Sequence, residues 1–336
     1  MKVQLPSYAS HPLALLLLLL LLSPYESFRA TTLNPTSTIG PCRRLFPVYS
    51  SFIEEDTICL DVLHDDENII AITKPSGVIS MPCASASSGT AAHIAADYLY
   101  NGMRPKEADG VLAHGIVHKL DKEVSGLILL AKNKKVSKIL SKRFSNREVT
   151  KKYIAIVHGQ YRDPNQSEND DEISVLTWPI YRKSSGKAAI ALTDKDMEKA
   201  KDALTRVKVL ASNSTFSLLE IEIDTGRYHQ IRVHLAHAGY PLVGDSEYCY
   251  TVRTMASGAQ VQAFSPSSKG GRKMGGLWSN KYERAMLHSF SMLVAHPISN
   301  EMIELHSLLP ADMKTLASGL ARSCDVGDRL WYLWQD

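Results

Sequence analysis

The stretch FSLLEIEID at residues 216–224 constrains the fold more than any other feature, because its side chains alternate between apolar and acidic. In an extended chain, this alternation places the two kinds of side chain on opposite faces. The faces carry Leu219, Ile221 and Ile223 on one side, and Glu220, Glu222 and Asp224 on the other. A strand with one buried face and one solvent-exposed face is typical of an antiparallel sheet. We therefore predict a mostly antiparallel sheet built around this strand.

Further apolar segments predict the elements beside it. Three short apolar runs predict buried strands, at residues 69–73, 126–131 and 152–159. Helical spacing of apolar residues predicts helices over 135–146 and over 232–239, the second ended by its glycine. Strands and helices are interspersed without a regular βαβ rhythm. The fold class predicted is α+β, with a mixed, mostly antiparallel central sheet and flanking helices.

The N-terminus reads as a leader in two parts. An apolar run at residues 13–22 is shorter than the ~20 residues that span a bilayer and resembles a signal-peptide core, so we interpret residues 1–27 as signal-like. Residues 28–53 contain arginine and many hydroxyl residues but no acid, which is typical of a transit peptide. Two such signals in series resemble the leaders of algae with complex plastids. We expect a plastid location, with the mitochondrion and the secretory route as alternatives.

Composition places few limits on function. Hydrophobic residues make up 44% and charged residues 22% of the 336, an ordinary globular balance with a net charge of +3. This charge permits nucleic-acid binding without requiring it. The five cysteines are scattered and include no CxxC pair, so neither a disulfide framework nor a zinc finger is indicated. A Gly/Ser-rich basic stretch predicts a flexible insertion at 251–280.

Four polar stretches stand beside predicted strands and are candidates for chemistry. They are KPSG at 74–77, HKLD at 118–121, KKY at 151–153 and TGRYHQIRVH at 225–234. Each stretch alone is a weak signal. The sequence has no glycine-rich phosphate loop and no GxSxG elbow, so a nucleotide-binding fold or a serine hydrolase is not supported.

A metal site is the competing interpretation of the second stretch. His114, His118 and Asp121 would need a helix to share one face, and Gly115 with its β-branched neighbours fits a strand or turn better. A metal-dependent hydrolase therefore remains the weaker alternative, and we expect no metal.

Taken in order, these stretches resemble the RluA-type pseudouridine synthases, which isomerise uridine in RNA. HKLDKEVSGLILLAKN matches the family form HRLDxxTSGLLLLAK, and VTKKYIAIVHG matches its second motif. TGRYHQIRVHLAHAGYPLVGDSEY matches the third, TGRxHQIRVHLAxxGxPLxGDxxY. With KPSGV before them and LHS…HP…LP at 287–310 after them, the resemblance runs over about 69–310. It implies the pseudouridine synthase fold with a central catalytic cleft, in one catalytic domain over 54–336. We expect no S4-like RNA-binding module, because no room for one remains.

The resemblance also implies roles for particular residues. Asp121 would be the catalytic nucleophile, Arg232 would pair with it and orient it, and Tyr153 would stack on the uracil and assist proton removal. Lys119 stands where the family has an arginine that helps to extrude the base, and Val124 stands where a hydroxyl residue is common. The RNA-binding residues implied are Lys119, Lys74, His118, Arg227 and His229.

The implied reaction limits cofactors and partners. It breaks the N1–C1′ bond of uridine and rejoins the base through C5 without any redox change, so no cofactor is expected. The carboxylate can act as a covalent nucleophile or remove a sugar proton. The expected substrate is ribosomal or transfer RNA, bound by a monomer that, without its leader, is not stably attached to membranes. A catalytically weak RNA-binding protein of the same fold is the alternative; the presence of both Asp121 and Arg232 favours the enzyme.

Overall fold

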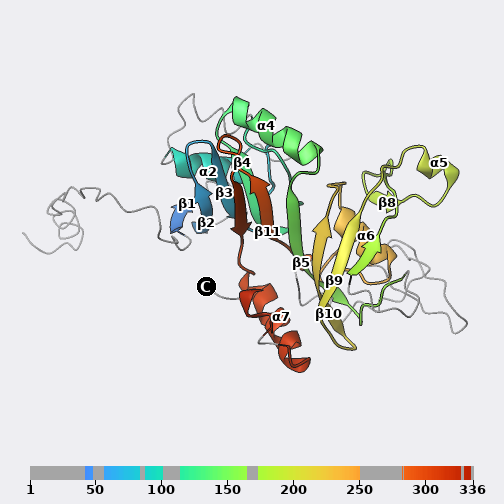
Figure 1. The fold of residues 1–336 in the computed structure, drawn as a ribbon. Coiled ribbons are helices and arrows are strands. Elements are labelled where there is room, and N and C mark those ends of the chain that lie inside the picture. Colours follow the sequence, from blue (N-terminus) through green and yellow to red (C-terminus); the bar gives the residue numbers. More distant parts are fainter. Residues whose placement is uncertain are drawn as a thin grey trace, which may run out of the picture. The chain divides into compact units, whose positions relative to one another are not determined.

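The computed structural model describes residues 42–47, 57–83, 88–100, 114–164, 173–249, 282, 284–326 and 329–333. Ten of the described strands form one sheet, in the order β1-β2-β3-β4-β11-β5-β10-β9-β6 with β12 beside β11 (Figure 1). These strands are β1 (Cys42–Pro47), β2 (Thr57–Asp65), β3 (Ile69–Lys74), β4 (Ser125–Ala131), β5 (Thr150–His158), β6 (Ile173–Leu176), β9 (Thr205–Ser212), β10 (Phe216–Ile223), β11 (Leu287–Ala295) and β12 (Met302–His306). Two further strands, β7 (Ile180–Arg182) and β8 (Ala188–Ile190), pair with each other.

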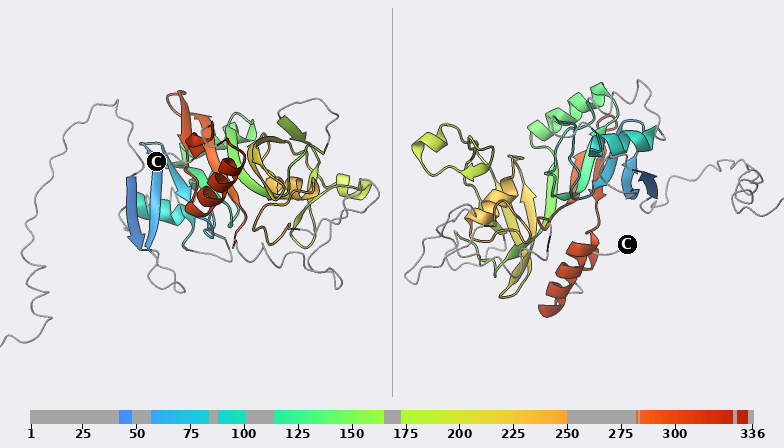
Figure 2. Two further views of the ribbon diagram at one scale, coloured as in Figure 1. Left: turned by 90° about the horizontal axis from the view of Figure 1, so that it is seen from below. Right: turned by 180° about the vertical axis from the view of Figure 1, so that it is seen from behind.

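The helices lie beside this sheet (Figures 1 and 2). They are α2 (Ala91–Leu99), α4 (Lys134–Ser145), α5 (Asp194–Met197), α6 (Gln230–His237), α7 (Ala311–Ser323) and the 3-10 helix η3 (Trp331–Leu333). The α+β class and the mostly antiparallel sheet are confirmed. Among the described residues, no helix is both long enough and apolar enough to cross a bilayer.

One parallel contact joins the two halves of the sheet. β4 runs parallel to β11, with Ser125 opposite His288 and Gly126 opposite Ser289, whereas the other strand pairs are antiparallel. Gly126 has a φ of +112°, and a Cβ there would lie 2.3 Å from the carbonyl oxygen of Ser289. Only glycine therefore allows the strands to meet at this point. Asp121, four residues before Ser125, is placed at the junction of the two halves.

The half of the sheet before this junction is covered on both faces. Alternate residues of β3, such as Ile70 and Ile72, pack in the apolar cluster that contains α2. Their neighbours Ile69 and Ala71 pack in the cluster that contains Val136 of α4. Burial on both sides explains why these strands read as continuous apolar runs rather than as alternating ones.

In the half after the junction, one face of β10 is fully covered and the other only in part. Leu219 and Ile221 pack with Ile231 and other residues of α6, while Leu218 packs in the cluster that contains α7. The acidic face keeps its water contact and also makes cross-strand ion pairs, between Glu220 and Lys152 at 3.3 Å and between Glu222 and Arg206 at 3.6 Å. The predicted alternation is confirmed for residues 219–224, whereas Phe216, Ser217 and Leu218 are all buried.

Most boundaries predicted from sequence agree with the structure. The helix at 135–146 is α4, and the helix at 232–239 is α6, followed by Gly239 with a φ of +93°. β1 lies inside residues 28–53, the transit-like segment, and pairs with β2 through six residues. The leader itself stays a prediction, and the insertion at 251–280 lies outside the described residues.

Candidate active site

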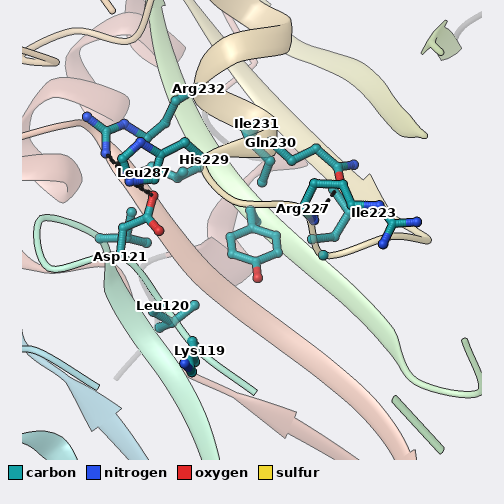
Figure 3. A pocket seen from close by; sticks show the side chains of 13 residues that line it. Lys119, Leu120, Asp121, Ile223, Arg227, His229, Gln230, Ile231, Arg232 and Leu287 are labelled. Atoms are coloured by element: carbon teal, nitrogen blue, oxygen red, sulfur yellow. Dashed lines mark hydrogen bonds and ion pairs between the residues drawn. The ribbon is translucent and has the colours of Figure 1, made fainter. Parts of the chain in front are cut away.

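A pocket opens where the two halves of the sheet meet (Figure 3). Its walls come from the loop before β4, from β5, from the end of β10 with the loop to α6, from α6 itself and from β11. The lining residues are Lys119, Leu120, Asp121, Val124, Tyr153, Ile223, Gly226, Arg227, His229, Gln230, Ile231, Arg232 and Leu287. Six of the eight residues predicted for the site thus line one pocket; Lys74 and His118 do not.

Asp121 lies in this pocket with its carboxylate toward Arg232 (Figure 3). Its Oδ2 accepts a hydrogen bond from the Arg232 guanidinium at 3.5 Å, and the Nε2 atom of His229 lies 3.7 Å away. Burial raises the pKa of the Asp121 carboxyl above its ordinary value, and Arg232 opposes that shift. The side chain is 24% exposed, so a substrate can reach it.

Arg232 is buried among four carboxylates. Its Nε and Nη2 donate to the two oxygens of Asp245 at 2.7 and 2.8 Å. Its contacts with Asp121, Glu247 and Glu123 are longer, at 3.5, 3.5 and 3.6 Å. The guanidinium is therefore anchored by Asp245 and reaches Asp121 with Nη1. The pairing of Arg232 with Asp121 agrees with the sequence interpretation, but Asp121 is its weaker partner.

Sequence reasoning missed the residues that hold Arg232. Asp245 is buried and also accepts from the backbone N–H groups of Glu247 and Tyr248. Tyr248 places its ring 5.0 Å from the guanidinium carbon and its hydroxyl 2.9 Å from Nδ1 of His229. A signal was present, since GDSEY lies inside the third motif, but its partners could not be read from spacing.

Tyr153 forms part of the apolar wall of the pocket. It is 7% exposed and packs in a cluster with Leu120, Val124 and Ile223. Burial, with the nearby Asp121 carboxylate second, raises the pKa of the Tyr153 hydroxyl. The phenol therefore stays protonated at neutral pH, next to an apolar surface suited to a flat ring.

The side-chain amide of Gln230 is the main link that fixes the loop before α6, beside the bonds of Thr225 to Leu204 and of Arg227 to Asp202. Gln230 accepts from the Thr225 hydroxyl and the Arg227 N–H, and donates to the Leu204 carbonyl and the Thr205 hydroxyl. All its hydrogen-bonding capacity holds the loop to β9. Sequence reasoning did not assign Gln230 a role.

His229 and Arg227 occupy the same loop but differ in exposure. His229 begins α6 with a φ of +54°, and burial, followed by the Arg232 charge, lowers its pKa to about 3. It is therefore a neutral ring beside Asp121. Tyr228, half exposed, stacks on it with ring centroids 3.7 Å apart. Arg227 is partly exposed, lines the pocket and donates Nε to the Asp202 carbonyl.

The structure corrects the role implied for Lys74. Lys74 is buried completely, and its Nζ donates to the backbone carbonyls of Pro75, Val78 and Lys122. Burial lowers the pKa of Lys74 to about 7, and its Nζ faces backbone carbonyls, so no donor is left for RNA. Its contact with Lys122, next to Asp121, shows a structural role instead.

The whole KPSGVIS segment clamps the loop that carries Asp121. Gly77 N–H donates to the Lys122 carbonyl, and the Ser76 hydroxyl donates to the Glu123 carbonyl. Ser80 donates its hydroxyl to the Leu120 carbonyl at 2.7 Å and accepts from the Leu120 N–H at 3.0 Å. Both sides of Asp121 are thus fixed by one distant segment.

His118 and Lys119 point to different surroundings. His118 is not a pocket residue: its Nε2 accepts from the Leu129 N–H, and its ring stacks on Phe144 at 4.8 Å. Burial lowers its pKa to about 3, so it carries no charge for a phosphate. The RNA-binding role implied for His118 is therefore not supported by its contacts. Lys119 is exposed at the pocket edge.

The geometry does not support a metal site at His114, His118 and Asp121. His114 is exposed, His118 is bound to the backbone, and Asp121 faces Arg232. Within the described ranges, no group of three or more His, Cys, Asp and Glu side chains is arranged to hold a metal ion.

Comparison with known proteins identifies the class to which this fold and pocket belong. Residues 68–237 match the family described as RNA pseudouridylate synthase, and the chain belongs to this family. The matched residues include the first two motifs, the first half of the third and the loop that carries Asp121. The chain is accordingly an RNA pseudouridine synthase of the RluA type, an isomerase that acts on RNA.

Individual relatives agree with this assignment. The chain is 30% identical to the uncharacterized RNA pseudouridine synthase YlyB of Bacillus subtilis, over 79% of this chain and 74% of that protein. It is 32% identical to ribosomal large subunit pseudouridine synthase D of Haemophilus ducreyi, over 80% and 72%. The structure of human RNA pseudouridylate synthase domain containing 4 superposes with a TM-score of 0.51 at 26% identity, over 78% of this chain and 92% of that one.

Proposed function

We propose that Asp121 is the nucleophile that isomerises uridine in structured RNA. The observation that carries this proposal is a partly exposed carboxylate in the pocket, 3.5 Å from a buried guanidinium. One carboxylate oxygen attacks C1′ of the sugar, and the N1–C1′ electron pair leaves with the uracil. The uracil turns, C5 bonds to C1′, and the carboxylate is released. The proton displaced from C5 passes to water or to the freed carboxylate, and N1 takes up a proton from water, so that the base ends neutral.

Arg232 acts on the charge of the nucleophile. Burial alone would keep Asp121 protonated, and a protonated acid attacks poorly. The guanidinium cannot lose its proton, so it favours the ionised carboxylate throughout the cycle. Because Asp245 takes the two shortest bonds, Arg232 does not hold Asp121 so tightly that attack is blocked.

Tyr153 serves as the platform for the uracil. Its raised pKa opposes a role as proton acceptor at neutral pH, so stacking is the role that we assign. A base leaves the RNA stack at a cost of a few kcal/mol. Stacking of that base on an aromatic side chain stabilises the complex by about 1–3 kcal/mol. Lys119 at the pocket edge adds a positive charge for the neighbouring phosphate.

We propose ribosomal or transfer RNA as the substrate, and the similarity to the Haemophilus ducreyi ribosomal large subunit pseudouridine synthase D favours ribosomal RNA. The test maps pseudouridine in organellar RNA incubated with the wild type and with Asp121→Asn. Pseudouridine at defined positions with the wild type alone supports the proposal. If the wild type binds RNA but forms no pseudouridine, the protein is instead a catalytically weak RNA-binding protein of the same fold.

We also propose that residues 1–53 direct the chain to a plastid. The support is the signal-like apolar run followed by the acid-free, arginine-bearing segment. Fusion of residues 1–53 to a fluorescent reporter in an alga with complex plastids tests the proposal. Fluorescence in the plastid is expected, and secretion into the medium or labelling of mitochondria would contradict it. We further propose that the protein is a monomer, as expected from the sequence. Analytical sedimentation of the purified protein tests its oligomeric state.

A further inference from the structure

Positive charge is concentrated in one short part of the chain. Residues 132–152 contain nine lysines and arginines and a single acid, Glu148, whereas the whole chain has a net charge of only +3. The remainder of the chain is therefore net negative. The segment consists of α4, the turn after it and the start of β5.

Five of these nine charges lie on the outer side of α4 and in the turn after it. The helix buries Val136 and Leu140 against the sheet. Its other side, with the turn that follows, forms the α4 basic face. This face consists of Lys134, Lys135, Lys138, Lys142 and Arg147, all of them exposed. In the part of the chain that the structure describes, no carboxylate pairs with any of these five side chains.

The arrangement of these charges is unfavourable for the helix itself. Lys134 and Lys138, and likewise Lys138 and Lys142, are like charges at i,i+4, which repel. Lys134 and Lys135 lie in the first turn, at the positive end of the helix dipole, and that turn has no acid. An anionic ligand on this face would remove both costs.

The helix that carries the α4 basic face packs, through Phe144, against two segments that lead into the active-site pocket. Phe144 in the last turn of α4 stacks on His118, whose neighbour Lys119 lines the pocket. Lys151 lies 6.0 Å from the same Phe144 ring, two residues before Tyr153. A polyanion that places one nucleotide in the pocket can therefore extend along α4.

We propose that the α4 basic face binds the phosphate backbone of the RNA that flanks the uridine in the pocket. This inference rests on the proposed function, because RNA is the polyanion held at that pocket. The contacts are to phosphates and carry no base specificity. They add affinity and salt dependence, while the chemistry stays with the pocket.

The test measures binding of bulk transfer RNA to the full chain at several KCl concentrations. All proteins carry Asp121→Asn, so that binding is measured without turnover. The test variant replaces Lys135, Lys138 and Lys142 by glutamine, which keeps helix propensity while removing three charges of one stripe. A matched control replaces Lys187, Lys195 and Lys199, exposed lysines near α5, by glutamine. An arginine version of the α4 variant keeps the charge.

Each phosphate contact contributes about 0.7 to 0.9 to the slope of log affinity against log salt. We expect the α4 glutamine variant to lose about 2 from this slope and to bind about tenfold more weakly near 0.1 M KCl. The arginine version and the α5 control should bind like the parent. Unchanged slope and affinity in the glutamine variant, or equal losses in the α5 control, would overturn the proposal.

Two further measurements separate the alternatives. Vesicles of phosphatidylserine and phosphatidylcholine test a lipid surface: loss of vesicle binding in the α4 variant, with RNA binding intact, would reassign the face. Pseudouridine formation by the protein with Asp121 present is measured separately. If no pseudouridine forms, the proposed function fails, while the binding data still decide the role of the α4 basic face.

Discussion

At the scale of single residues, Asp121 shares the guanidinium of Arg232 with Asp245. Arg232 is buried with Asp245 at 2.7 Å and reaches Asp121 only at 3.5 Å. Asp245 is itself ionised, because the Arg232 bonds and two backbone N–H bonds, acting against burial, hold its pKa below the ordinary value. Asp245 thus positions Arg232 and also raises the pKa of Asp121 by its own charge.

Replacing Asp245 by Asn should separate these effects. Breaking a buried ion pair from one side costs about 3–5 kcal/mol, so we expect a lower free energy of unfolding in urea. The rate constant kcat should fall while the dissociation constant for RNA changes little, since Asp245 is not a pocket residue. Glu247→Gln, at a longer contact, is the control and should change both quantities less. A variant with lost stability but full kcat would contradict the positioning role.

The pH dependence of activity follows from the raised pKa of Asp121. The ionised carboxylate is the active form, so activity is lost as pH falls through this pKa, at a higher pH than for an ordinary aspartate, near 3.9. Asp245→Asn removes a charge that raises the pKa and frees Arg232 for Asp121. Both changes lower the pKa, so the acidic limb of kcat/KM against pH should move to lower pH. A shift to higher pH, or no shift, would exclude this coupling.

At the scale of elements, the loop that carries Asp121 depends on a segment forty residues earlier in the chain. Ser80 holds both backbone groups of Leu120, and Lys74, Gly77 and Ser76 hold the two residues after Asp121. The clamp explains why polar residues follow a buried strand at KPSG without lining the pocket. Its role is to fix the nucleophile.

Ser80→Ala should therefore affect catalysis as well as stability. It leaves the N–H and carbonyl of Leu120 without their side-chain partner, at a cost of about 1–3 kcal/mol. Looser placement of Asp121 should lower kcat by about tenfold to hundredfold with unchanged RNA affinity. Ser76→Ala, which removes one bond, serves as a milder comparison. Stability loss in Ser80→Ala without a loss of kcat would limit Ser80 to folding.

The elements also show what the sequence could predict. Periodicity located β3, β4, β5, β10, α4 and α6, because each has a clear apolar face or run. The residues Asp121, Arg232 and Tyr153 were found through motif resemblance, and they meet in one pocket. Lys74 and His118 do not line the pocket, and a sequence does not show that backbone groups occupy their polar atoms. Asp245 was missed for the same reason.

At the scale of the whole molecule, the edge of the sheet lies within the sequence interpreted as a leader. β1 pairs with β2 through residues 42–47, and the compact unit begins at Pro41. Removal of residues 1–40 would keep this pairing, whereas removal of residues 1–53 would leave β2 as an open edge.

Two truncated chains test the contribution of β1. Residues 41–336 and residues 54–336 should have the same kcat, because the pocket residues lie far along the chain from β1. The shorter chain should have the lower Tm and aggregate more readily, because an unpaired strand edge recruits other chains. Equal Tm values and equal solubility would mean that β1 contributes nothing to the folded domain.

The central claim is that Asp121 drives uridine isomerisation, and hydrogen release from C5 tests it most directly. A new bond to C5 displaces the hydrogen there, so RNA with uridine tritiated at C5 should release one tritium to water for each pseudouridine formed. Asp121→Asn should bind the same RNA equally well and release tritium at least about 10⁴-fold more slowly. Release by Asp121→Asn at the wild-type rate, or no release by the wild type on RNA that it binds, would contradict the account.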